Sequence, residues 1–164
     1  MPEFPPASAR IPSFKPSAES MAGVQQVVKE IYAGGVPRKT LEMVHMRASQ
    51  INGCNGCMTY GLHNAAAAGI PAEQLVLLPA WRESALFSDS ERAALALTEA
   101  ITRLADHPDA VSDEIWARAA EHFDESALAA LVSMAALTNY FNRVNTTLRI
   151  QPGTPGTANE PSVR

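Results

Sequence analysis

The sequence predicts an all-α fold, on three observations. Apolar residues recur at helical spacing in several segments, most of which begin at a Ser or Asp and end at Gly or Pro. No segment shows the alternation of a strand, and no internal repeat is visible. With 164 residues, 46% of them hydrophobic, the chain is long enough for one domain with a sizeable core.

The first sixteen residues are expected to form an extended arm. Five prolines fall in residues 1–16, which is too many for a helix. Phe4, Ile11 and Phe14 would dock this arm on a neighbouring surface. The helical domain is expected to cover residues 17–150 and to open with a helix over residues 17–32, which Ser17 caps. Residues 151–164 are rich in Pro, Gly and polar residues, which predicts a flexible, solvated tail.

Two helices joined by a tight turn follow. The pattern of the first runs over residues 37–50 and stops at Asn52-Gly53, where Gly or Asn takes the left-handed conformation. The second starts at or just after Cys54 and runs to Gly69. Helices with so short a connection usually pack antiparallel.

The remaining chain predicts four more helices. A short helix over residues 71–78 has Pro near its first turn and is broken by Pro79. Ser88 to Glu91 reads as a capping box and opens a helix to about residue 104. Ser112 caps a helix to about residue 123. The last helix begins at Asp124 or Ser126 and runs over residues 127–148, with apolar residues on nearly all sides.

Both cysteines of the chain lie in the turn, as Cys54-Asn-Gly-Cys57. The helix N-terminus favours an anion there, which lowers the pKa of the Cys54 thiol and raises its thiolate fraction. Cys57 lies one turn further on the same face, so the pair can close and reopen a disulfide. In a reducing cytosol such a pair is more often catalytic or metal-binding than structural.

The preceding helix directs a second set of residues at this pair. Glu42 and His45 share one face with Met46 and Ser49, at i, i+3, i+4 and i+7. We therefore expect a carboxylate and an imidazole near the cysteines, as a base and a proton relay. Tyr60, three residues after Cys57, is a candidate donor to a developing anion.

Charge and composition exclude several classes of protein. The net charge is −4 with no basic stripe, so nucleic-acid binding has no electrostatic footprint. No apolar run approaches the roughly 20 residues that a membrane span needs. The N-terminus lacks the layout of a signal peptide, which favours a cytoplasmic location.

Over about residues 18–150, the sequence resembles the alkylhydroperoxidase D-like (AhpD-like) carboxymuconolactone decarboxylase superfamily. The matching phrases are Arg47-Ala-Ser-Gln-Ile-Asn-Gly53 with Cys54-Asn-Gly-Cys57, and Glu42 twelve residues before the first cysteine. Further support comes from Gly69, Trp81, the segment from Phe87 through Glu91 to Leu95, and Asn139 with Asn142-Arg143.

This resemblance implies an AhpD-like helical bundle that assembles into trimers or hexamers. It also implies a peroxidase or thiol–disulfide oxidoreductase that needs no cofactor, takes a hydroperoxide as its substrate and is restored by a dithiol reductant protein. In that family the second cysteine attacks the peroxide and the first resolves the sulfenic acid, which assigns Cys57 and Cys54 to those roles. The helix-terminus argument instead makes Cys54 the more acidic thiol, so the two arguments disagree.

One position departs from the family pattern. The histidine that usually lies four residues after the second cysteine is Gly61 here, and the one found between the cysteines in some members is Gly56. His63 lies about 180° around the helix from Cys54. His45 is therefore the better replacement relay. The departure puts peroxide reduction in question but leaves thiol–disulfide exchange intact.

Other readings of these residues stay open. The cysteines could be small buried apolar residues, and a zinc site would need two further ligands that the sequence does not supply easily. Glu42 could be a solvated residue in the first turn of its helix. The protein could be a lactone-processing or carbon-acid enzyme of the decarboxylase branch that uses Glu42 and His45, or a non-catalytic oligomeric module.

Overall fold

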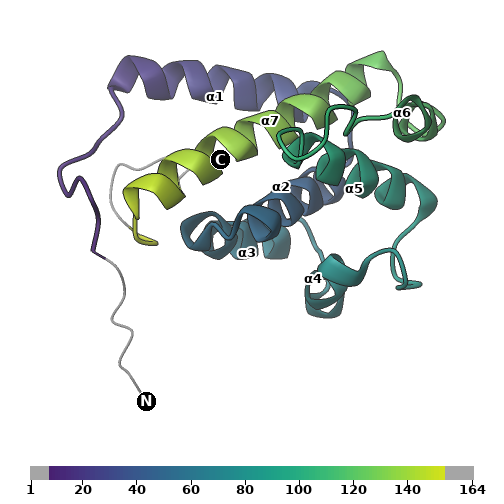
Figure 1. The fold of residues 1–164 in the computed structure, drawn as a ribbon, viewed down its shortest axis with the longest axis horizontal. Coiled ribbons are helices and arrows are strands. Elements are labelled where there is room, and N and C mark those ends of the chain that lie inside the picture. Colours follow the sequence, from purple (N-terminus) through teal and green to yellow (C-terminus); the bar gives the residue numbers. More distant parts are fainter. Residues whose placement is uncertain (1–7, 154–164) are drawn as a thin grey trace.

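The structure is a computed structural model, described here for residues 8–153. These residues form seven α-helices and one 3₁₀ turn, without a strand, which confirms the predicted all-α fold. Figure 1 shows their arrangement. The elements are α1 (Ala18–Ala33), α2 (Arg38–Asn52), α3 (Asn55–Ala67), α4 (Ala72–Leu77), η1 (Leu78–Ala80), α5 (Asp89–Thr102), α6 (Asp113–Ala120) and α7 (Glu125–Leu148).

Helix α2 lies at the centre of the fold and packs against α3, α5 and α7 (Figure 1). Its residues 40–44 and 46–49 are all buried. Leu41 and Val44 join a core with α1, α5, α6 and α7, whereas Met43 and Met46 join a second core with α3, α4, η1 and α5. Because both sides of α2 are covered, its polar residues are carried into the interior as well.

The helix starts follow the predicted caps. Side-chain oxygens of Ser17, Ser88, Ser112 and Asp124 each accept the backbone N–H three residues further on. Ser88 and Glu91 form the full reciprocal capping box that the sequence predicted. These local hydrogen bonds satisfy N–H groups that the helices themselves leave free.

Several predicted helix ends were wrong by a few residues. Helix α2 ends at Asn52 with Gly53 as its cap, as predicted, whereas α5 ends at Thr102 and α6 at Ala120, where the chain turns earlier than the apolar pattern suggested. Helix α4 ends at Leu77, just before Pro79, as predicted, and the chain continues as a 3₁₀ turn. Pro79 lies in the first turn of the 3₁₀ helix η1, where its missing N–H costs no hydrogen bond.

The N-terminal segment, residues 8–17, runs without helix beside the end of α7 (Figure 1). The Arg10 backbone N–H donates to the Leu148 carbonyl at 2.9 Å, and the Arg10 guanidinium donates to Thr147. Phe14 is half-buried and Ile11 is exposed. The rest of the predicted arm, residues 1–7, and residues 154–164 of the predicted tail lie outside the described residues.

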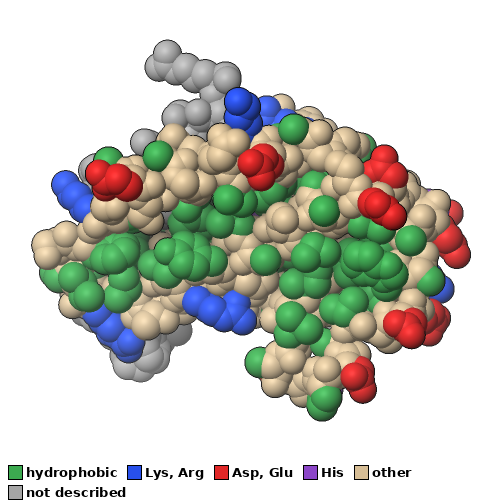
Figure 2. All heavy atoms as spheres, turned by 90° about the horizontal axis from the view of Figure 1, so that it is seen from above, with side chains coloured by type: hydrophobic (Ala, Val, Ile, Leu, Met, Phe, Trp, Pro, Cys, Tyr) green, Lys and Arg blue, Asp and Glu red, His purple; other side chains and the backbone are tan. Residues whose placement is uncertain are grey.

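Hydrophobic side chains also reach the surface. Figure 2 shows them gathered in a band along the length of the face seen from above α1. The exposed large hydrophobic residues include Val27 of α1 and Tyr140 of α7. Helix α7 is therefore not covered on all sides within one chain.

Candidate active site

The turn between α2 and α3 places both cysteines. Gly53 ends α2 with a positive φ of 64°, a conformation that glycine adopts without steric cost. Cys54 is the N-cap of α3, and its Sγ accepts the backbone N–H of Cys57 at 3.3 Å. The predicted position of Cys54 at a helix N-terminus is thus confirmed.

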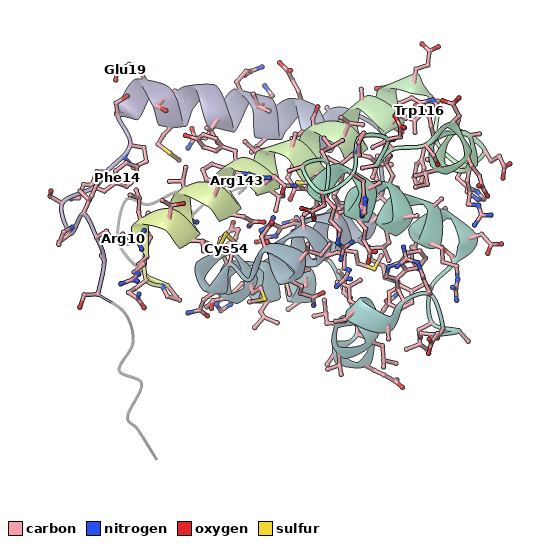
Figure 3. All side chains as sticks on the ribbon, viewed as in Figure 1. Arg10, Phe14, Glu19, Cys54, Trp116 and Arg143 are labelled. Atoms are coloured by element: carbon pink, nitrogen blue, oxygen red, sulfur yellow. A yellow bond between two sulfur atoms is a disulfide. The ribbon has the colours of Figure 1, made fainter. Side chains whose placement is uncertain are left out.

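Cys54 and Cys57 form a disulfide, with Cα atoms 5.3 Å apart. Both residues are nearly fully buried, at 1% and 3% exposure. The Asn145 amide of α7 donates to Cys57 Sγ at 3.4 Å. Figure 3 labels Cys54, beside the C-terminal part of α7 from which Asn145 comes. The sulfurs therefore sit where α3 meets α7.

The two sulfur-bearing residues border different spaces. Cys57 lines a cavity of about 70 Å³, and four candidate residues meet there, because Glu42, His45 and Tyr60 line the same cavity. Its remaining wall is mainly apolar and comes mostly from α1 and α7, including Ile31, Met134, Leu137 and Phe141. Cys54 lines a separate surface depression beside Arg149.

Glu42 is wholly buried, at 0% exposure, so a solvated position in its helix is wrong. Its Oε1 accepts the Tyr32 hydroxyl at 2.5 Å and lies 3.9 Å from the Arg38 Nε. Its Oε2 has no hydrogen-bond partner among the described residues. His45 Nδ1 lies 3.9 Å from this oxygen, which is too far for a direct hydrogen bond.

Burial controls the charges of this pair. Burial raises the pKa of Glu42, although the Tyr32 hydroxyl, the Asn64 amide and Arg38 oppose it in that order. Burial also lowers the pKa of His45 to about 4, so the imidazole is neutral at pH 7 and the two groups do not form an ion pair. A carboxylate with a raised pKa is a stronger base than an exposed one, which suits it to take a thiol proton.

Gly61 explains how His45 fits beside the cysteines. A Cβ at this position would lie 2.3 Å from the Met46 Sδ and 3.1 Å from the His45 Cε1. A histidine at position 61, as the family pattern has it, cannot coexist with these two side chains as they stand. The imidazole from α2 thus borders the space that a side chain from α3 would otherwise fill.

Three residues of the site were not predicted from the sequence. Tyr32 and Asn64 line the cavity beside Glu42, and Asn145 contacts Cys57. Asn145 continues the spacing of Asn139 and Asn142 along α7, so an i, i+3, i+6 search for asparagines would have found it. No sequence signal marks Tyr32. His63 is exposed and does not line the cavity.

Buried polar contacts hold α2 against its neighbours. The Asn52 amide donates to the Oδ1 atoms of Asn139 and Asn142, and the Asn142 amide donates to the Ser49 hydroxyl. On the other side, the Arg47 Nε lies 2.6 Å from the Glu99 Oε1. Because buried polar groups are costly when unpaired, these contacts fix the rotation of α2 about its axis.

Residues 8–153 contain neither a candidate metal site nor a candidate membrane-spanning helix. No group of three His, Cys, Asp or Glu residues is placed to hold a metal ion. No helix in this range has the length and apolarity needed to cross a membrane.

The sequence model of the carboxymuconolactone decarboxylase family matches residues 18–100, about half of the chain. YdfG, an uncharacterised protein of Bacillus subtilis, is 31% identical over 138 residues, which cover 84% of this chain and 92% of YdfG. The chain belongs to the carboxymuconolactone decarboxylase family. A second family relative, the uncharacterised protein YnjA of Escherichia coli, is 33% identical over 108 residues, which cover 66% of this chain and 58% of YnjA.

Solved structures of similar fold support an AhpD-like bundle. ATU0492 from Agrobacterium tumefaciens, a protein of unknown function suggested to be the antioxidant defence protein AhpD, has a TM-score of 0.80 at 24% identity. The match covers 90% of this chain and 99% of ATU0492. The apo debrominase Bmp8 has a TM-score of 0.69 at 20% identity, covering 86% of this chain and 75% of that chain. Both likenesses concern the fold alone.

Proposed function

We propose that this protein is a cysteine-based oxidoreductase that reduces hydroperoxides and exchanges thiols with disulfides. One observation carries the proposal: Cys57, which forms a disulfide with Cys54, lines the same mainly apolar cavity as the buried Glu42 carboxylate. A reactive sulfur, its bonding partner and a base of raised pKa are the groups that such chemistry needs.

In the reduced protein, Glu42 takes the Cys57 proton, directly or through the neutral His45 imidazole and a water. The thiolate attacks the terminal oxygen of the hydroperoxide, an S–O bond forms, and the O–O bond breaks. The departing alkoxide takes up a proton to leave as an alcohol, and Tyr60, which lines the cavity, is our candidate donor. Cys57 is then a sulfenic acid.

Cys54 completes the cycle. Its sulfur attacks Cys57 Sγ, the S–S bond forms, and the sulfenic oxygen leaves as water. An external dithiol then reduces the disulfide and is itself oxidised, so that the two electrons given to the peroxide come from the dithiol. A dithiol reductant protein in the reducing cytoplasm suits this step.

The geometry favours Cys57 as the first nucleophile. Cys57 lines the cavity with Glu42, whereas Cys54 does not. Cys54 is nevertheless the N-cap and accepts an N–H, so its thiolate is stabilised as well. A stabilised thiolate at Cys54 suits the resolving role, because it is ready to attack once the sulfenic acid has formed. The two sequence arguments thus describe two steps of one cycle.

We expect the protein to work as a homo-oligomer, a trimer or hexamer in the pattern of its family. Exposed Val27 and Tyr140 lie on α1 and α7, which also wall the cavity. A second copy that covers these helices would remove apolar surface from water.

The test is the hydroperoxide-dependent loss of both thiols in the reduced protein, with the single variants Cys54→Ser and Cys57→Ser. In Cys54→Ser the reaction is expected to stop at a sulfenic acid on Cys57, which dimedone traps. In Cys57→Ser no sulfenic acid should form, so dimedone should label nothing. Persistence of both thiols under excess hydroperoxide contradicts the proposal. A trapped sulfenic acid in Cys57→Ser alone reverses the order of the cysteines.

A second candidate uses the same cavity without the sulfurs. Glu42 Oε2 is unpartnered and faces His45 across 3.9 Å, an arrangement suited to acid–base chemistry on a lactone or carbon acid. Activity on such compounds that survives the double Cys→Ser change favours this function. Because Bmp8 is a debrominase, and a cysteine-to-alanine variant of it was solved with 2,3,4-tribromopyrrole, halogenated small rings belong in the same substrate panel.

A further inference from the structure

The two oxygens of Glu42 have different surroundings. Oε1 accepts the Tyr32 hydroxyl at 2.5 Å, whereas Oε2 meets no donor at hydrogen-bond geometry within residues 8–153 and is the oxygen nearer to the His45 Nδ1. The Asn64 amide also lies close enough to lower the pKa of the carboxyl group. The terminal torsion of a glutamate is roughly two-fold, so without a specific partner either oxygen can take either position. Here the Tyr32 hydroxyl occupies Oε1 through a hydrogen bond that the carboxylate charge strengthens, and Oε2 stays available.

The placement of Tyr32 depends on how α1 ends. Gly34, the residue that caps α1, approaches α7 so closely that a Cβ there would lie 2.5 Å from the Ala130 Cβ. This close approach packs the last turn of α1 against α7. The Arg38 guanidinium lies 5.7 Å from the centre of the Tyr32 ring, within the range of a cation–π contact. The Tyr32 side chain therefore contacts two residues of α2, Glu42 through its hydroxyl and Arg38 through its ring.

We propose that Tyr32 is a positioning residue, which binds Oε1 of Glu42 so that Oε2 alone is presented to the cavity to take the Cys57 proton. This inference rests on the proposed thiol chemistry, and it assigns a task to a residue outside the cysteine motif. Tyr32, Glu42 and Cys57 line the same cavity, so the orientation of the Glu42 carboxylate acts directly at the proposed site of thiol oxidation.

The electrostatic surroundings fit this task. Burial and the adjoining Glu42 raise the pKa of Tyr32, which keeps its hydroxyl protonated and a donor. The titratable or charged groups that face Glu42 are Tyr32 from α1, Arg38 and His45 from α2, and Cys57 and Tyr60 from α3. The α7 residues of the cavity wall carry no charge.

Removing the hydroxyl has two expected consequences. Tyr32 lowers the pKa of Glu42, so Tyr32→Phe raises it and moves the acid limb of the rate of thiol oxidation towards higher pH by about one unit. The rate above this limb falls roughly tenfold, because the carboxyl group rotates and Oε2 is no longer presented alone. Reduction of the disulfide by dithiothreitol needs no such base and stays within about twofold of wild type.

The experiment measures thiol oxidation by hydroperoxide against pH in wild type, Tyr32→Phe and the control Tyr140→Phe. Tyr140 is exposed, its ring contacts Phe141, and it neither lines the Glu42 cavity nor hydrogen-bonds a carboxylate within residues 8–153, so its variant should keep the wild-type profile. The carboxyl carbon of Glu42 is titrated by NMR in the same proteins, which requires no peroxidase activity. An unshifted Glu42 titration and an unshifted acid limb in folded Tyr32→Phe overturn the inference.

The same NMR titration separates the two proposals. If wild type fails to react with hydroperoxide but Glu42 shifts in Tyr32→Phe, the proposed function fails while the Tyr32–Glu42 coupling stands. If Tyr32→Phe does not fold, the wild-type protein provides the test. A hydroxyl proton bound to a buried carboxylate should give a downfield signal that disappears in Glu42→Gln, and its absence from wild type counts against Tyr32.

Discussion

Gly61 offers a direct test of the packing that places His45. Gly61→Ala has two opposing effects on the free energy of unfolding. Replacing a glycine inside a helix by alanine contributes about 1 kcal/mol of stability. The new Cβ would meet Met46 Sδ at 2.3 Å, however, and overpacking a filled interior costs about 1–3 kcal/mol. We therefore expect a net loss of about 1 kcal/mol, because the overlap outweighs the helical gain.

Gly23 provides the matched control. It lies within α1, and a Cβ there would meet nothing within 4 Å. Gly23→Ala should therefore raise stability by up to about 1 kcal/mol, so that the two variants differ by about 2 kcal/mol. Urea denaturation with far-ultraviolet circular dichroism measures both. A double-mutant cycle with Met46→Ala should show that Gly61→Ala no longer destabilises once the sulfur is gone. If Gly61→Ala stabilises as much as Gly23→Ala, the close approach of α3 to α2 is wrong.

Three further predictions follow from the charges and contacts of the site. First, the folded-state pKa of His45, about 4, lies below its ordinary value of 6.5, so the unfolded chain binds the proton first as the pH falls. The free energy of unfolding should therefore fall by up to about 3 kcal/mol between pH 6.5 and pH 4. His45→Asn should not show this loss, and urea unfolding at several pH values measures both proteins. Second, burial raises the pKa of Glu99, but hydrogen bonds from Trp81, Arg82 and Arg47 outweigh burial and hold the pKa at about 2. The stability that the ionised Glu99 contributes is therefore present above pH 4.5 and lost as the pH falls towards 2. Glu99→Gln should lower the free energy of unfolding by about 2–4 kcal/mol at pH 7 in the same assay, because it leaves the buried Arg47 charge unpaired. Third, Asn145→Ala in a Cys54→Ser background should raise the pKa of the Cys57 thiol by about one unit, because a donor to the thiolate is lost. The pH dependence of alkylation measures this pKa. An unchanged alkylation profile would mean that Asn145 does not donate to the Cys57 sulfur in the reduced protein.

Much of the fold was accessible from the sequence because its signals are local. A capping side chain and the backbone N–H that donates to it lie three residues apart, as at Ser88 and Glu91, and both are visible in any four-residue window. The same holds for Gly53, which ends α2, and for Cys54, which begins α3. The errors lie at the ends of α5 and α6, where the apolar pattern continues past the point at which the backbone changes its hydrogen bonding.

The sequence by itself determined the helical elements and the spacing of the sulfurs, since three residues on a helix place Cys54 and Cys57 one turn apart whatever surrounds them. It also placed Glu42 and His45 on one face of their helix. Only the tertiary structure decided which of these groups share a cavity and in what charge state. The Tyr32 hydroxyl, the Asn145 amide and the bare backbone of Gly61 come from three helices and meet α2 or Cys57 only after packing. Burial then sets the pKa of a carboxyl or imidazole, and burial is a property of the packed neighbours rather than of the residue or its spacing.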